Sequence, residues 1–132
     1  MTQEHKELLL KDLCARLPYG IKFLRESWNY EWDQELSVIE VLEDIDKDGY
    51  INNTKVYNVE DIKPYLFSLS SMTDEQYDQL YIDSRVKEDS IDIIDALAND
   101  MDAIDWLNKN HFDYRGLIEK GLAIDATGLN IY

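Results

Sequence analysis

The spacing of apolar residues changes at Gly20 and again at Thr73, which limits the fold that this chain can adopt. Before Gly20 apolar residues recur every three or four positions, as in an amphipathic helix. Between the two points they tend to alternate, as in strands with one buried face, and after Thr73 the helical spacing returns. The pattern predicts an α+β fold with an N-terminal helix, a small antiparallel sheet that is SH3-like or barrel-like, and a C-terminal cluster of short helices.

The length of 132 residues fits one domain that can bury a core without metal or disulfide bonds. Within residues 1–132 we expect a helix in 1–18, mainly β structure in 19–70, helices in 71–126 and a tail in 127–132. Cys14 lies among the apolar residues of the first helix, so we expect it to be buried and unreactive.

Turn residues and proline set the expected course of the β region. Residues 35–45 fit a strand or a helix, and we favour a strand because 46–49 form a typical hairpin turn with Gly49 at the position that needs a positive φ. Pro64 cannot donate a backbone hydrogen bond, so we expect residues 58–69 to leave the sheet and run along its edge.

Two signals place the later helices. Thr73 and Gln76 form a capping box, which predicts a helix start at residue 74. Residues 90–98 fit a helix or a strand, and we favour a helix. A further helix is expected from about residue 99 to residue 110.

Residues 111–115 are expected to form a tight corner before a second short helix over 114–120, which Asp113 would cap. Phe112 and Tyr114 would anchor the core. His111 would carry partial positive charge at the negative end of the preceding helix. We interpret the polar cluster of the corner as a structural network rather than a catalytic one. The corner comprises His111, Phe112, Asp113, Tyr114 and Arg115.

Trp28, Tyr30 and Trp32 alternate with polar residues, which places three aromatic rings on one side of an extended segment. Such a stripe has two interpretations. Exposed, it would bind a partner protein; otherwise it would cover the core, which we favour because aromatic rings are usually buried. Stacking on nucleic-acid bases fits poorly, because the neighbouring residues are acidic.

The acidic turn resembles the start of an EF-hand calcium loop. Asp44, Asp46, Asp48 and the Tyr50 carbonyl occupy the first, third, fifth and seventh positions. The twelfth position should hold a bidentate Glu but holds Lys55. We therefore favour a plain acidic hairpin, with weak divalent-metal binding as the alternative.

Composition excludes several classes of function. A formal net charge of −15 repels nucleic-acid phosphates and anionic lipid, so direct binding to either is not expected. One cysteine excludes an intrachain disulfide, and the sequence has neither a signal-peptide pattern nor an apolar run that would span a membrane, which together suggest the cytoplasm. No phosphate-binding glycine loop, zinc-ligand set or nucleophile motif is present, so we expect no cofactor and no enzymatic activity.

Residues 61–73 (DIKPYLFSLSSMT) and 105–126 (DWLNKNHFDYRGLIEKGLAIDA) resemble a family of small uncharacterised proteins of gut bacteria, prophages and mobile elements. The shared motifs are KPYLxxxSSMT and HFDYRGLIEKGLA. This chain has Phe67 and Ser68 at the two positions where Arg-Pro is common in that family. The resemblance implies no activity. We expect a small acidic, non-enzymatic accessory protein of a prophage or mobile element that binds another protein, with mimicry of nucleic-acid charge as a special case. The alternative is a module that binds a divalent metal weakly.

Overall fold

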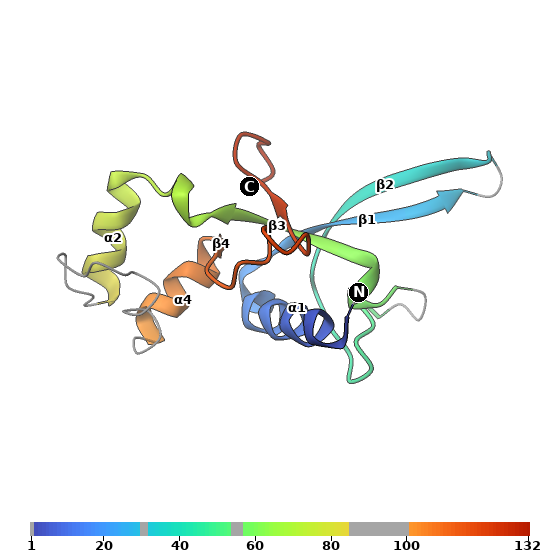
Figure 1. The fold of residues 1–132 in the computed structure, drawn as a ribbon, viewed down its shortest axis with the longest axis horizontal. Coiled ribbons are helices and arrows are strands. Elements are labelled where there is room, and N and C mark those ends of the chain that lie inside the picture. The colour runs from blue at the N-terminus through green and yellow to red at the C-terminus, as the bar shows by residue number, and fades with distance from the viewer. Residues whose placement is uncertain (1, 30–31, 54–56, 85–100) are drawn as a thin grey trace.

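The computed structural model describes residues 2–29, 32–53, 57–84 and 101–132 (Figure 1). The helices are α1 (Gln3–Arg16), α2 (Asp74–Ser84) and α4 (Met101–Lys109), and 3₁₀ turns cover Leu17–Tyr19, Val59–Asp61 and Leu69–Ser71. The strands are β1 (Lys22–Asn29), β2 (Gln34–Val41), β3 (Ile62–Ser68), β4 (Phe112–Asp113) and β5 (Ile124–Asp125). The α+β class is therefore confirmed, while residues 90–98 lie outside the described part.

Helix α1 lies within the expected range 1–18 and begins after Thr2, whose hydroxyl accepts a hydrogen bond from the His5 N–H. Leu9 and Leu13 point into the core and are fully buried. Cys14 is exposed, which contradicts the expected burial. Successive residues of a helix lie about 100° apart, so the side chain that follows Leu13 turns away from a narrow buried face.

The sheet is mixed and open, with the strand order β2-β1-β3-β4 and with β5 also paired to β3. β1 runs antiparallel to β2 and to β3, whereas β4 and β5 run parallel to β3. The expectation of an antiparallel, SH3-like or barrel-like sheet is therefore wrong. β3 changes partner along its length, and the two-residue strands β4 and β5 do not extend the sheet far enough to close it.

Pro64 lies inside β3, which is a central strand, so the expected edge course of this segment is also wrong. The Leu42 N–H donates to the Ile21 carbonyl, so Ile21 directs its backbone groups toward β2. Because this direction alternates along an antiparallel strand, Phe23 also faces β2, whereas Leu24 faces β3. Pro64 is opposite Phe23. Its missing N–H therefore falls at a position that donates no bond to β1.

The stretch 71–126 contains two short strands as well as helices. The capping box at Thr73 and Gln76 is confirmed, with hydrogen bonds of 2.8 and 3.2 Å. The expected helix over 114–120 is absent, because Gly116 has a φ of +73° and residues 117–121 form turns. The Asp113 carboxylate instead accepts hydrogen bonds from the N–H groups of Leu117 and Ile118, at 2.9 Å each.

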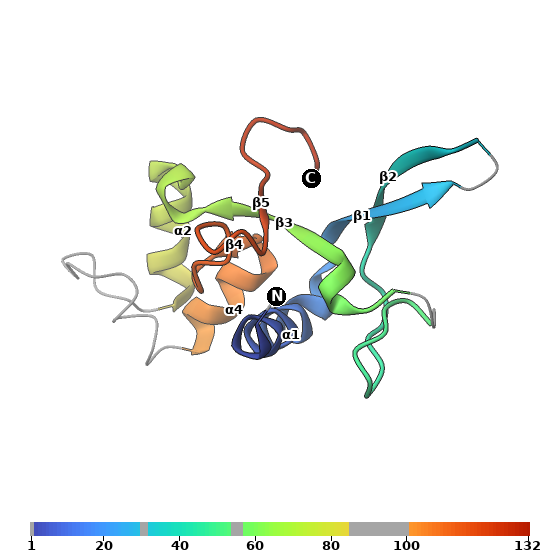
Figure 2. The ribbon, with the colours of Figure 1, turned by 45° about the vertical axis from the view of Figure 1, so that its right-hand side comes forward.

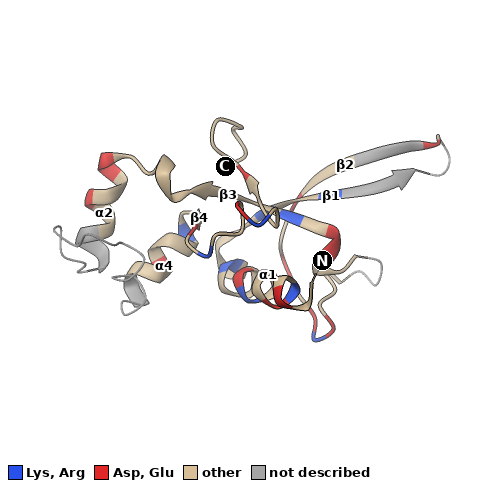
Figure 3. Cartoon of the chain, in the orientation of Figure 1, with Lys and Arg blue, Asp and Glu red and all other residues tan. Residues whose placement is uncertain are grey.

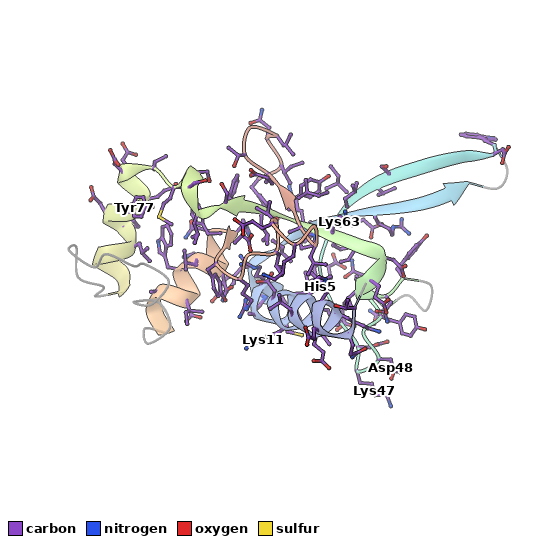
Figure 4. The ribbon with its side chains drawn as sticks, viewed as in Figure 1. His5, Lys11, Lys47, Asp48, Lys63 and Tyr77 are labelled. Carbon is purple, nitrogen blue, oxygen red and sulfur yellow. The ribbon has the colours of Figure 1, made fainter. Side chains whose placement is uncertain are left out.

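Two clusters of buried residues form the core. The first lies between α1 and the sheet and comprises Leu9, Leu13, Ile21, Phe23, Leu42, Ile51, Val59, Ile62, Leu66, Leu117, Leu122 and Ala123. The second joins α2, α4 and the far end of β3 and comprises Met72, Leu80, Ala103, Trp106, Leu107 and Phe112. The side chain of Tyr77 on α2, labelled in Figure 4, packs against this second cluster.

The expected tail, residues 127–132, folds back onto the sheet. The Tyr132 hydroxyl accepts a hydrogen bond from the Lys22 N–H and donates one to the Tyr65 carbonyl, both at 2.8 Å. It therefore bridges β1 and β3 just beyond Phe23 and Pro64, where their pairing ends. Burial raises the pKa of this hydroxyl, so it stays protonated at neutral pH. None of the described helices is long and apolar enough to span a membrane.

Candidate functional site

The hairpin formed by β1 and β2 extends away from the rest of the molecule. Figures 1 and 2, viewed 45° apart, both show its outer end far from the helices. The eight residue pairs from Lys22↔Val41 to Asn29↔Gln34 hold the two strands together. The inner end is fixed to the core through Phe23, which is 1% exposed. The described residues thus anchor the hairpin to the core at its inner end.

The aromatic stripe does not lie on one extended segment, which corrects the sequence interpretation. Trp28 is the penultimate residue of β1 and is opposite Glu35, whereas Trp32 follows the end of β1 and lies in a turn. Asp33 has a φ of +51°, in the left-handed region that Asp tolerates, and this conformation reverses the chain. Tyr30 lies outside the described residues, as does the placement of the Trp28 side chain.

Trp32 is 67% exposed, so this residue does not cover the core as we had favoured. β2 carries two further exposed apolar side chains, Ile39 at 49% and Val41 at 41%. Sequence analysis did not single these out. Their position two residues apart, with Ser37 completing the alternation, was the signal that could have found them, since alternate residues of a strand share a face.

The inner half of the hairpin carries an ion pair. The Arg25 guanidinium lies 2.9 Å from the Glu40 carboxylate and 4.2 Å from the centre of the Tyr57 ring. Both charged side chains are partly exposed, so the pair contributes about 0–1 kcal/mol to stability. Its structural effect is to hold Glu40 on the side of the hairpin that faces Tyr57.

The corner at residues 111–115 is tied to α1 by buried charges that sequence analysis missed. Asp12 and Arg16 are fully buried and lie 2.8 Å apart, and Arg115 approaches the other oxygen of Asp12 at 2.7 Å. Arg16 also donates to the Phe112 carbonyl. The spacing of Asp12 and Arg16 by four residues, between the buried positions of the first helix, was the available signal.

These contacts account for most of the polar groups of the corner. The Tyr114 hydroxyl donates to the Asn108 side chain at 2.9 Å, and the guanidinium groups of Arg16 and Arg115 lie 5.3 and 4.5 Å from the centre of the Tyr114 ring. Asp12 and Asp113 both bind groups within the chain, so the polar groups of the corner hold α1 against β4.

His111 is not the partly cationic residue that the sequence suggested. It follows α4 with a φ of +64°, and its ring stacks on Tyr132 with centres 3.9 Å apart. Burial, with smaller effects from Arg16 and Lys22, lowers the pKa of the imidazole to about 4. The ring is therefore neutral at neutral pH. A general base needs a pKa nearer the working pH, so this environment suits packing better than proton transfer.

The polar groups of the acidic turn form hydrogen bonds with one another. Asp46 Oδ1 accepts hydrogen bonds from the N–H groups of Asp48 and Tyr50, at 2.9 Å each, and the Tyr50 carbonyl accepts one from the Asp46 N–H. Figure 4 shows Lys47 and Asp48 at the outer end of this loop. Across the described part of the chain, no three His, Cys, Asp or Glu side chains are grouped so as to hold a metal ion.

Two isolated bridges, Ile45↔Ile51 and Tyr50↔Asn58, are the β pairing that the described residues show around the turn. Gly49 has the expected positive φ, +85°. An added Cβ there would lie 3.2 Å from Asn58, so the turn and the following segment are closely fitted. The loop is thus a short hairpin closed by both backbone and side-chain hydrogen bonds.

Comparisons with known proteins give no match for this chain, whether with protein-family models, curated proteins or solved structures.

Proposed function

We propose that this protein is a small acidic accessory protein of a prophage or mobile element that acts in the cytoplasm by binding another protein and has no catalytic role. The observation that carries the proposal is the projecting β1–β2 hairpin with Trp32 exposed near its tip (Figure 1). Tryptophan is enriched among the residues that dominate binding energy in protein interfaces. A hairpin that projects from the core also presents its strands to a partner (Figure 1).

Charge supports a basic partner. The chain has 28 acidic and 13 basic residues, and Figure 3 shows acidic residues from α2 through α1 to the outer end of the hairpin. A field of this sign speeds the approach of a positively charged surface and repels phosphates. Within the proposal, a DNA-binding protein is one such partner, and the acidic surface would then imitate the charge of nucleic acid.

The proposed absence of catalysis rests on how the polar groups are used. His111 is stacked and neutral, Asp113 binds two backbone N–H groups, and Asp12 is held by two arginines. Each of these groups has a role in packing that accounts for its position. The resemblance of residues 61–73 and 105–126 to proteins of prophages and mobile elements supports the proposed setting.

The test is affinity capture from a native bacterial extract followed by mass spectrometry, with Trp32→Ala compared against Leu129→Ala. Leu129 is a suitable control because it is also exposed, at 51%, and lies outside the hairpin. We expect a specific partner that is lost with Trp32→Ala, is retained with Leu129→Ala and has a basic surface. Equal capture by both variants, or capture of no specific protein, would contradict the proposal.

A second measurement tests the charge-mimic form. If the captured partner binds DNA, adding this protein should displace the DNA in proportion to its concentration. Simultaneous binding of DNA and of this protein would exclude mimicry while leaving the protein-binding function in place.

A further inference from the structure

We infer that the outer edge of β2 binds an extended, basic segment of a partner protein by adding it to the sheet as a further strand. This inference rests on the proposed function and specifies the surface and the chemistry of the partner. It is carried by the backbone of β2, by the exposed side chains beside its edge and by the charge of the hairpin.

β2 is an edge strand, since it stands at one end of the strand order β2-β1-β3-β4. Residues 2–29, 32–53, 57–84 and 101–132 include no strand that pairs with its other edge. An unpaired edge offers backbone N–H and C=O groups in a row, and extended peptides bind such edges through main-chain hydrogen bonds.

The register shows which residues direct their backbone groups outward. The Leu42 N–H donates to the Ile21 carbonyl, just before β1, at 2.8 Å, so Leu42 faces β1. In an antiparallel pair the facing residues alternate. Ser37, Ile39 and Glu35 therefore direct their N–H and C=O groups away from β1, and Val41 does the same.

The inner limit of this open edge is defined. Asn52 Nδ2 donates to the Val41 carbonyl at 2.9 Å, which satisfies the last outward carbonyl of β2. The same side chain accepts from the N–H groups of Glu43 and Asp44. The edge from Glu35 to Ile39 is thus left between Asn52 at one end and the hairpin tip at the other. An edge of this length can pair with a short extended segment of a partner protein.

Side chains beside the edge favour a segment in which apolar and basic residues alternate. Ile39 and Val41 are exposed on one face of β2, and an added strand would place an apolar residue beside them. Residues 22–43 include six acidic residues and two basic ones, Lys22 and Arg25, which gives the hairpin a net charge of −4. Charge complementarity therefore assigns a basic segment to the edge. The acidic residues are Glu26, Glu31, Asp33, Glu35, Glu40 and Glu43.

The same charge opposes pairing between two copies of this chain. Two β2 edges would bring two hairpins of net charge −4 together, on molecules that each carry −15 overall. Repulsion of this kind is a common protection against edge-to-edge association. A basic segment removes the repulsion and gains attraction instead.

Ser37 provides the sharpest test. Because its N–H faces away from β1, Ser37→Pro removes an outward donor without removing a bond to β1, and proline is tolerated at such edge positions. Ser37→Ala keeps the donor and is the matched control. Circular dichroism and urea denaturation establish that both variants remain folded.

The probe is a fluorescent nine-residue peptide of alternating lysine and valine, measured by fluorescence anisotropy against the full chain. We expect saturable binding that Ser37→Ala leaves unchanged and Ser37→Pro weakens at least tenfold. Binding should also weaken as salt rises, and a peptide of alternating glutamate and valine should not bind. A fully N-methylated copy of the basic peptide tests the main-chain bonds without altering the protein, and it should also fail to bind.

Several results would overturn the inference: no binding of the basic peptide, equal binding by Ser37→Pro and Ser37→Ala, or undiminished binding of the N-methylated peptide. A dimer that Ser37→Pro dissociates would show that the edge accepts a second copy, which also contradicts a basic segment. If the partner captured from extract still binds Ser37→Pro, the inference fails and the proposed function stands. If no partner is captured while the peptide results hold, the proposed function fails alone.

Discussion

At the scale of single residues, Phe112 connects several elements of the fold. Its ring is 1% exposed and stacks on Trp106, with centres 5.7 Å apart and planes 8° from parallel. It also contacts Phe67, with ring centres 6.0 Å apart. Its carbonyl receives the buried Arg16 guanidinium. One residue thus joins α4, β3 and α1.

We predict that Phe112→Ala lowers the free energy of unfolding by about 3–5 kcal/mol, the range for truncating a buried aromatic ring. Urea denaturation at neutral pH measures the change. Phe112→Leu is the control, because it keeps most of the apolar volume and should cost less. A loss below about 1 kcal/mol for the alanine variant would mean that the ring contributes little to the core.

His111 should make stability depend on pH. Its pKa is lowered to about 4 in the folded state, against about 6.5 in an unfolded chain. Between these values the unfolded state binds more protons, so stability rises with pH; the contribution is complete above about pH 6.5 and is lost as pH falls toward 4. His111→Asn should flatten this slope, because Asn keeps the left-handed backbone but does not titrate.

The measurement for His111 is urea denaturation of both proteins at intervals from pH 7.5 to pH 4.5. The difference in unfolding free energy between wild type and His111→Asn should shrink as the pH falls. Parallel pH profiles for the two proteins would contradict the environment described for the ring.

At the scale of elements, the loop between β2 and β3 has the residue pattern of a calcium loop but uses its polar groups to stabilise a turn. Asp46 is used to bind backbone N–H groups, and the Tyr50 carbonyl, which an EF-hand would direct at the ion, accepts from Asp46 instead. Lys55 also replaces the bidentate Glu of the calcium loop. Both features work against a tight site.

We therefore predict no saturable calcium binding below about 1 mM, the weak limit of extracellular calcium modules. Titration calorimetry at physiological salt tests this, with magnesium as the control for general screening of the acidic surface. Stoichiometric binding at micromolar calcium that Asp44→Ala abolishes would instead support the divalent-metal alternative.

At the scale of the whole molecule, the net charge of −15 should act on stability as well as on binding. Like charges repel more strongly in a compact state, and salt screens them over about 10 Å at 0.1 M. We predict that the urea midpoint rises as sodium chloride increases from about 0.01 to 0.15 M. Replacing the exposed carboxylates of Glu43, Asp105 and Glu119 by amides should reduce this rise.

A midpoint that falls with salt would contradict that prediction. It would mean that attraction within exposed pairs such as Lys6–Glu60 outweighs the repulsion between exposed carboxylates. Urea is the suitable denaturant, because guanidinium chloride is itself a salt and would screen the charges.

The sequence by itself determined the features that depend on neighbouring residues. Thr2 and Thr73 cap helices through bonds to N–H groups three residues away, and Gly49 permits the turn after β2. The change to alternating apolar residues after Gly20 likewise predicted β1. Such signals can be recognised locally because backbone bonds within a helix or turn join residues close in sequence.

Only the tertiary structure decided which distant segments meet. Pairing of Phe67 with Phe112 makes a short strand within the expected corner, and Tyr132 bridges β1 and β3. The burial of Asp12 and the exposure of Trp32 depend in the same way on what packs against each side chain. A residue pattern specifies which faces are apolar, but the partner of each face is selected by the packing of the whole chain.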